Sequence, residues 1–90
     1  MNKISARHIL VDKEFEAKDL LKKLEAGESF EQLAKDFSTC GSASDGGDLG
    51  EFGRGMMVAD FEKAAFALAV GEVSGVVKTQ FGCHIIKRDA

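Results

Sequence analysis

Few side chains in this sequence could carry out acid–base or covalent chemistry in a shared site. There are two histidines, His8 and His84, two cysteines, and neither tyrosine nor tryptophan. Each histidine lies in a mostly apolar stretch of sequence, which is more typical of a hydrogen-bonded core residue than of a catalytic group. If the strands that carry them are neighbours, the rings would form a neutral hydrogen-bonded pair, because adjacent buried imidazoles can hardly both be charged.

The two cysteines differ in their surroundings. Cys40 begins a glycine-rich segment, where a partly exposed thiol beside a histidine could act as a nucleophile. No cysteine-hydrolase signature surrounds it, so an unreactive thiol is the favoured alternative. Cys83 directly precedes His84 and should point to the opposite face of a strand, with a packing role. Two cysteines make no disulfide framework, and free thiols are expected.

The spacing of the remaining polar residues argues against a metal or a cofactor. No C-x-x-C or H-x-x-x-H spacing for zinc occurs, and Asp45, Asp48 and Glu51 do not follow an EF-hand pattern. The glycines of GEFGRG, residues 50–55, match neither a dinucleotide fingerprint nor a P-loop. We therefore expect no metal site and no cofactor.

Composition narrows the class of protein and its partners. The 90 residues carry a formal net charge of −3, whereas binding of nucleic acid needs a basic stripe. Nucleic acid is therefore not expected as a partner. No apolar run is long enough for a signal peptide or a membrane helix, so a membrane is not expected as a partner either. Proline is absent, which disfavours an extended linker. We predict a single domain over residues 1–90, monomeric and cytoplasmic.

Hydrophobic periodicity predicts the elements that must position these residues. A mostly buried strand is expected over residues 4–11, and two strands joined near Lys78–Gly82 over residues 73–87. Apolar residues at helical spacing predict three helices, from Glu14 to a cap at Gly27, from a cap at Ser29 to Phe37, and from Met57 to a cap at Gly71. Residues 38–55 hold six glycines and predict a loop with a short strand. This order is typical of an α+β domain, a small antiparallel or mixed sheet covered by helices.

Large apolar side chains gather beside the glycine-rich segment. They are Phe52, Met56, Met57, Phe61 and Phe81. A role in the core is the simpler interpretation. The alternative is an apolar pocket for a hydrophobic ligand, in which methionine supplies adaptable contacts.

Four blocks of sequence, in this order, together resemble a known family. ARHILV, FEQLAKDFSTC, SASDGGDLGEFGRGMMVADFEKAAFAL and GEVSGVVKTQFGCHIIK are similar to a small, single-domain, PpiC-like parvulin, a peptidyl-prolyl cis/trans isomerase. The resemblance covers nearly the whole chain. It implies the parvulin-like (FKBP-like) fold, a four-stranded antiparallel sheet surrounded by helices. It also implies rotation of Xaa-Pro bonds in proline-containing peptides and unfolded protein clients, without a cofactor.

The resemblance also implies the roles of particular residues. The catalytic set would be His8, Cys40, Thr79 and His84, joined in one hydrogen-bonded network. The pocket for the proline ring would comprise Leu49, Met57 and Phe61 with Phe81 at its rim, and Phe52 is predicted to contact the substrate as well.

Two departures from the family pattern bear on the prediction. Ala59 stands where relatives often carry a proline, which affects the start of the third helix. Residues 12–16, after the first strand, carry a net negative charge, whereas the family members that act on phosphorylated substrates have a basic loop there. Phosphorylated substrates are therefore not expected. A non-catalytic holder of apolar segments is the main rival function. A periplasmic or extracellular location would apply if the chain is part of a larger foldase.

Overall fold

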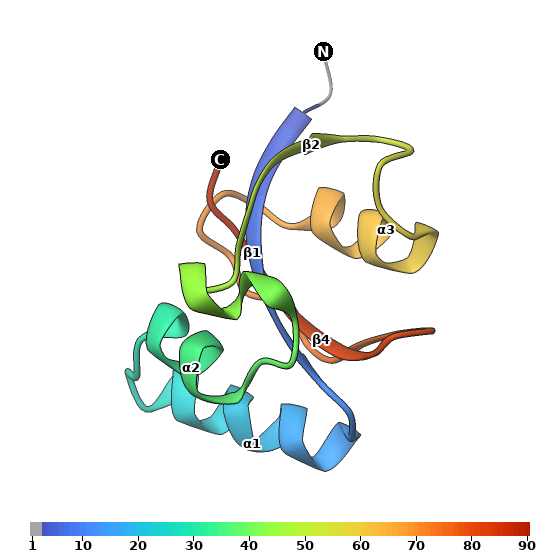
Figure 1. Cartoon of the computed structure of the whole chain (residues 1–90). Helices are drawn as coiled ribbons and strands as arrows, with labels where there is room; N and C mark the ends of the chain where they lie inside the picture. The colour runs from blue at the N-terminus through green and yellow to red at the C-terminus, as the bar shows by residue number, and fades with distance from the viewer. Residues whose placement is uncertain (1–2) are drawn as a thin grey trace.

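A four-stranded antiparallel sheet organises the chain (Figure 1). The computed structural model describes residues 3–90, and its strands are β1 (Lys3–Val11), β2 (Asp48–Gly53), β3 (Val77–Thr79) and β4 (Gly82–Arg88). They lie in the order β2-β1-β4-β3. The helices are α1 (Glu14–Glu25), α2 (Phe30–Phe37), the 3-10 helix η1 (Gly41–Asp45) and α3 (Ala59–Ala67). The predicted α+β class and the four-stranded antiparallel sheet are confirmed.

The two central strands, β1 and β4, separate two apolar cores. One core contains Ile9 and Ile85 and is covered by α1 and α2, and the other contains Ala6 and Ile86 and is covered by α3. Figure 1 shows β1 running between the α1–α2 pair and α3. Because side chains alternate along a strand, His8 and His84, each two residues away from Ala6 or Ile86, must face the α3 side. The alternation therefore brings both histidines to one face of the sheet.

Helices α1 and α2 follow the prediction closely. Gly27, just after α1, has a φ of +96°, the left-handed conformation that favours glycine at a helix end. The Ser29 hydroxyl accepts the Gln32 backbone N–H at 3.2 Å and caps α2. Within residues 3–90, no helix combines the length and the apolar character needed to cross a lipid bilayer.

The third helix and the last strands differ from the prediction. Helix α3 begins at Ala59 and not at Met57, and it ends at Ala67, because Val58 and Leu68 have extended backbones with ψ of 147° and 144°. Residues 73–76 do not form a regular strand. The Ser74 hydroxyl accepts the backbone N–H of Ile86 at 2.9 Å, in the place where a regular strand would offer a backbone carbonyl. The glycine-rich segment also contains the helical turn η1, which its composition did not predict.

Candidate active site

The two histidines meet on the α3 face of the sheet. In the β1–β4 ladder Leu10 pairs with His84 and His8 pairs with Ile86, so the imidazoles are diagonal neighbours. Their Nδ1 atoms lie 2.9 Å apart, and the ring planes differ by 20°. Both side chains are buried, with 4% of their surface exposed. The Phe61 ring packs edge-on against both rings, at centroid distances of 5.4 and 5.2 Å. The predicted histidine pair is therefore present.

Thr79 extends the pair into a chain of three side chains. Its hydroxyl lies 2.7 Å from Nε2 of His84 and accepts the backbone N–H of Phe81 at 3.2 Å. When the hydroxyl donates to Nε2, the proton of His84 resides on Nδ1 and is donated to Nδ1 of His8. His8 then carries its own proton on Nε2, a buried atom without a hydrogen-bond partner in the described residues. The reverse direction of donation leaves that atom as an unpaired acceptor, so both arrangements keep the two rings neutral.

Burial opposes the charged forms of both rings. It lowers the pKa of His8 from 6.5 to about 4, with the nearby His84 adding to the effect. Burial likewise lowers the pKa of His84. Two protonated rings would also place one N–H donor against another across 2.9 Å. At neutral pH the pair is therefore an uncharged, hydrogen-bonded unit.

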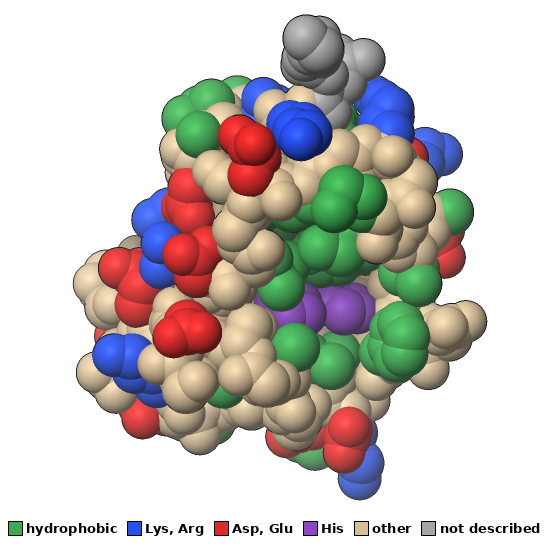
Figure 2. Space-filling view, turned by 45° about the horizontal axis from the view of Figure 1, so that its top comes forward, with side chains coloured by type: hydrophobic (Ala, Val, Ile, Leu, Met, Phe, Trp, Pro, Cys, Tyr) green, Lys and Arg blue, Asp and Glu red, His purple; other side chains and the backbone are tan. Residues whose placement is uncertain are grey.

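An apolar cavity of about 420 Å³ opens above the histidines. Its lining contains no Lys, Arg, Asp or Glu, and consists of His8, Leu10, Cys40, Leu49, Met56, Met57, Val58, Phe61, Phe81 and His84. Figure 2 shows the two histidines at the bottom of a hollow, with hydrophobic side chains around them and charged side chains outside it. Met56 and Phe81 are exposed at its mouth, with 64% and 59% of their surface accessible. Such a cavity suits a small apolar ligand group.

Cys40 lines this cavity but does not join the hydrogen-bonded chain. It is a free cysteine of intermediate exposure, and its backbone N–H donates to the Ser38 hydroxyl at 3.3 Å. Within residues 3–90, no hydrogen bond joins the Cys40 thiol to either histidine. The predicted four-residue network therefore consists of three residues, because the thiol belongs to the wall of the cavity. In the same residue range, no three His, Cys, Asp or Glu side chains lie close enough together to hold a metal ion.

Phe52, which was predicted to contact the substrate, lies in the core instead. Phe52 is 1% exposed and is not part of the cavity lining, and its ring packs against Phe61 and Phe66. It therefore supports Phe61 from behind and does not reach the cavity. Leu10 and Val58 line the cavity although neither was singled out in the sequence. Leu10 could have been found, because it lies two residues after His8 and thus on the same face of the strand.

Gly47 and Gly82 permit close backbone approaches beside the histidines. A Cβ atom on Gly47 would lie 2.3 Å from the carbonyl oxygen of His8, and the φ of Gly47 is +85°. The His8 backbone N–H donates to the Gly47 carbonyl at 2.9 Å. A Cβ atom on Gly82 would lie 2.7 Å from the carbonyl oxygen of Val11 and 3.2 Å from a Leu10 methyl group. These glycines let the glycine-rich segment and the β3–β4 turn close around β1.

Comparisons with known proteins agree with this geometry. A family model described as "Rotamase: PPIC-type PPIASE domain" matches residues 8–90. The foldase protein PrsA of Geobacillus kaustophilus is 59% identical over 86 residues, which are 94% of this chain and 31% of that protein. The crystal structure of PrsA from Bacillus subtilis has a TM-score of 0.97 at 56% identity, covering 99% of this chain and 35% of that one. The solution structure of NmPin, the parvulin of Nitrosopumilus maritimus, has a TM-score of 0.89 at 54% identity, covering 100% of this chain and 98% of NmPin.

The fold, the histidine pair and these matches define a peptidyl-prolyl cis/trans isomerase domain. The chain belongs to the PpiC-type rotamase family, whose small members are parvulins. It spans about three tenths of the length of the PrsA proteins and nearly all of NmPin. The family predicted from the four sequence blocks is thereby confirmed.

Proposed function

We propose that this chain accelerates cis/trans isomerisation of Xaa-Pro bonds in unfolded or flexible protein segments, and thereby assists folding. The observation that carries the proposal is the uncharged cavity of about 420 Å³ whose floor is a neutral histidine pair. The cavity offers an apolar seat for a proline ring. The histidines offer a polar surface of low charge beneath the neighbouring amide.

The energetic demand of this reaction is modest. Resonance keeps the X-Pro amide planar behind a barrier of about 20 kcal/mol, and no covalent bond needs to be made or broken. A catalyst must bind the twisted amide more tightly than either planar form. An acceleration of a thousandfold to a millionfold requires about 4 to 8 kcal/mol of such preference.

We assign the parts of the site to this task as follows. Leu49, Met57 and Phe61 hold the proline ring and anchor one side of the rotating bond. Their apolar surface strips water from the carbonyl group before proline, which weakens the resonance of the planar amide because that resonance is strongest when the carbonyl is hydrogen-bonded. The chain Thr79–His84–His8 keeps the floor polar and uncharged. Cys40 contacts the carbonyl side without forming a covalent intermediate.

We further propose that the substrates are not phosphorylated. The cavity lining offers no lysine or arginine to a phosphate group. Lys78, on the nearby strand β3, is already paired with Glu14 at 2.7 Å. Asp12 and Glu16 would repel an anion at the end of β1. A phosphoserine or phosphothreonine before proline should therefore weaken binding.

We extend the proposal to the clients of the chain, its oligomeric state and its location. The relatives include both longer foldases and a small parvulin, and the chain matches each of them well. We propose proline-containing unfolded proteins as clients and a monomer as the working form. Size-exclusion chromatography with light scattering tests the monomer, and immunoblotting of cell fractions tests the predicted cytoplasmic location.

NMR exchange spectroscopy on an unphosphorylated Xaa-Pro peptide tests the activity. We expect the cis/trans exchange rate to rise with added chain, and to fall back by about tenfold with Phe81→Ala, which removes an aromatic contact from the mouth of the cavity. Phe15→Ala is the matched control, because Phe15 is 63% exposed and Phe81 59% exposed but only Phe81 lines the cavity. If the peptide binds and its exchange rate does not change, the chain is a holder and the proposed activity is wrong.

A further inference from the structure

Leu49 reaches the cavity only because strand β2 is irregular. Leu49 and Phe52 are three residues apart, so in a regular strand they would point to opposite faces of the sheet. Both nevertheless pack against the core on the α3 side. The β1–β2 register explains this, because Ser5 pairs with Glu51 and Arg7 pairs with Asp48.

One residue of β1 therefore faces two residues of β2. Between the two pairs of that register, Ala6 stands alone, opposite both Leu49 and Gly50. This arrangement is a β-bulge, which inserts one extra residue into a strand and changes the direction of the side chains beyond it. The extra residue restores Leu49 to the face that carries Phe52 and His8.

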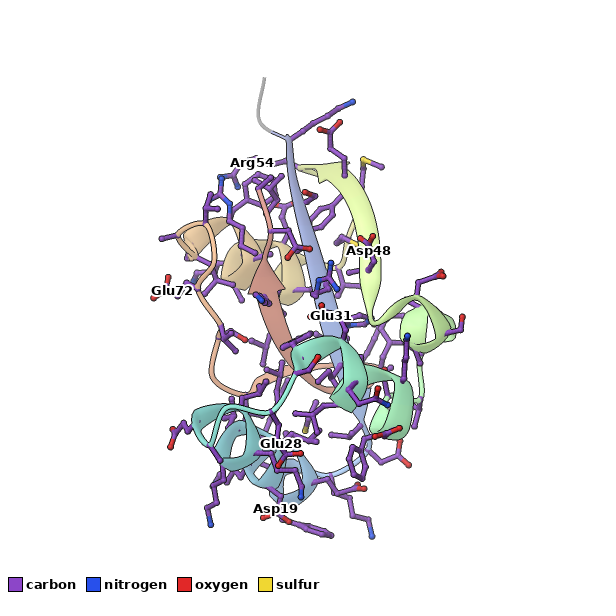
Figure 3. All side chains as sticks on the ribbon, turned by 90° about the vertical axis from the view of Figure 1, so that its left-hand side faces the viewer. Asp19, Glu28, Glu31, Asp48, Arg54 and Glu72 are labelled. Atoms are coloured by element: carbon purple, nitrogen blue, oxygen red, sulfur yellow. The ribbon has the colours of Figure 1, made fainter. Side chains whose placement is uncertain are left out.

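Gly50, the second of the two bulged residues, has a left-handed backbone conformation. Its φ is +72°, in the left-handed region that residues with a Cβ atom rarely adopt. Its backbone N–H donates to Oδ1 of Asp48 at 2.8 Å, which holds the bulge from within the strand. Figure 3 shows Asp48 on β2, next to β1. Asp48 is exposed and forms no ion pair within residues 3–90.

We propose that Gly50, supported by Asp48, is a positioning residue of the active site, and that the bulge it permits turns Leu49 into the substrate cavity. A one-residue change of register moves side chains to the other face of a sheet. Without the bulge, Leu49 would leave the cavity, and the site proposed to hold the proline ring would lose one of its three apolar contacts. The inference rests on the proposed function, because the seat is assigned to proline there.

The effect of a substitution at Gly50 is conformational and not a matter of space. A Cβ atom at this position would meet nothing within 4 Å. Gly71 offers a matched control, since its φ is +86°, a Cβ atom there would also meet nothing within 4 Å, and its N–H bonds to β4 through the carbonyl of Arg88. Gly71 does not line the cavity.

The experiment compares Gly50→Val with Gly71→Val. The dissociation constant of an unphosphorylated Xaa-Pro peptide is measured by NMR titration, and its cis/trans exchange rate is measured at saturation. We expect Gly50→Val to raise the dissociation constant about tenfold, the scale of losing a contact in a hydrophobic pocket. The rate at saturation should change less than about threefold, because Leu49 holds the ring in planar and twisted states alike and the other apolar residues of the lining still exclude water from the carbonyl group. Gly71→Val should leave the dissociation constant within about twofold of that of the unsubstituted chain. Gly50→Asn should do the same, because asparagine tolerates the left-handed conformation.

A double-mutant cycle separates positioning from a general structural effect. Leu49→Ala alone should raise the dissociation constant about tenfold, and adding Gly50→Val should change it by less than about twofold, because the side chain to be positioned is already gone. If the two effects multiply, or if Gly50→Val binds the peptide as Gly71→Val does, the proposal is wrong.

A variant without backbone strain keeps the proposal testable if Gly50→Val does not fold. Asp48→Ala removes only the acceptor of the Gly50 N–H, and we expect it to raise the dissociation constant severalfold with Leu49 present and not in Leu49→Ala. An unchanged dissociation constant in Asp48→Ala would overturn the assignment to Asp48. If the unsubstituted chain binds the peptide without accelerating exchange, the proposed activity fails, whereas the binding comparisons still decide whether Gly50 positions Leu49.

Discussion

Acidification should destabilise the folded chain through His8. This side chain is 4% exposed, and burial lowers its pKa from 6.5 to about 4. Between these two values the unfolded chain binds a proton at His8 that the folded chain does not, so the free energy of unfolding falls as the pH falls. Above about pH 6.5 the full contribution is present. It is lost progressively as the pH decreases toward 4.

The size of the effect follows from the difference between the two pKa values. At about 1.4 kcal/mol for each unit, the interval between 6.5 and about 4 corresponds to about 3 kcal/mol. By pH 5 about 2 kcal/mol should already be lost. A domain of this size has a total stability on the order of 5 to 15 kcal/mol, so the loss is large enough to measure. The lowered pKa of His84 acts in the same direction.

Urea unfolding between pH 8 and pH 5 measures the effect, since most carboxylates titrate below this range. The free energy of unfolding should decrease over this interval, and the decrease should be clearly smaller in His8→Gln, where only His84 remains. An NMR titration of the His8 ring should give a midpoint near pH 4. A flat profile between pH 7 and pH 5, or an equal slope in His8→Gln, would refute the argument that burial keeps His8 neutral.

Three further predictions concern the surroundings of the pair. Gly47→Ala should lower the free energy of unfolding, measured in urea, by more than about 3 kcal/mol, because its Cβ atom would lie 2.3 Å from the His8 carbonyl oxygen. A smaller decrease would contradict this close approach. Thr79→Val leaves Nε2 of His84 without its partner and should cost about 1 to 3 kcal/mol, with the exchange rate reduced as well. Thr79→Ser should restore both quantities. Cys40→Asp should still accelerate exchange in the NMR assay, because the proposed mechanism forms no covalent bond to Cys40. A carboxylate cannot replace a thiol in a covalent intermediate that must resolve, so complete loss with Asp but not Ser would favour a covalent route.

Local patterns were sufficient for the regular elements of the fold. The apolar spacing in α1 and α2, with caps at Gly27 and Ser29, predicted both helices to within two residues. The same reasoning misplaced the start of α3, because Met57 belongs to the apolar pattern but contributes to the cavity wall before the helix begins. It also missed the break in the edge strand at Ser74, where a side chain replaces a backbone partner.

The candidate site was predictable in part. The face shared by His8 and His84 follows from strand alternation, once the family resemblance supplies the antiparallel sheet. The exclusion of Cys40 from the hydrogen-bonded chain and the burial of Phe52 do not follow, since both depend on distances between segments far apart in the sequence. The resemblance named Leu49 as a pocket residue, but simple alternation from Phe52 would have placed it on the wrong face.

The sequence alone determined the class of this protein, because blocks of residues in a family's order specify a fold and a reaction together. It also determined which side chains are available for chemistry, since two histidines and two cysteines leave few choices. Only the tertiary structure decided how they are used. It placed two Nδ1 atoms 2.9 Å apart under an uncharged cavity, lowered the pKa of His8 to about 4 by burial, and turned Leu49 inward through one extra residue in β2. Burial and register are properties of contacts between distant segments, and no local pattern contains them.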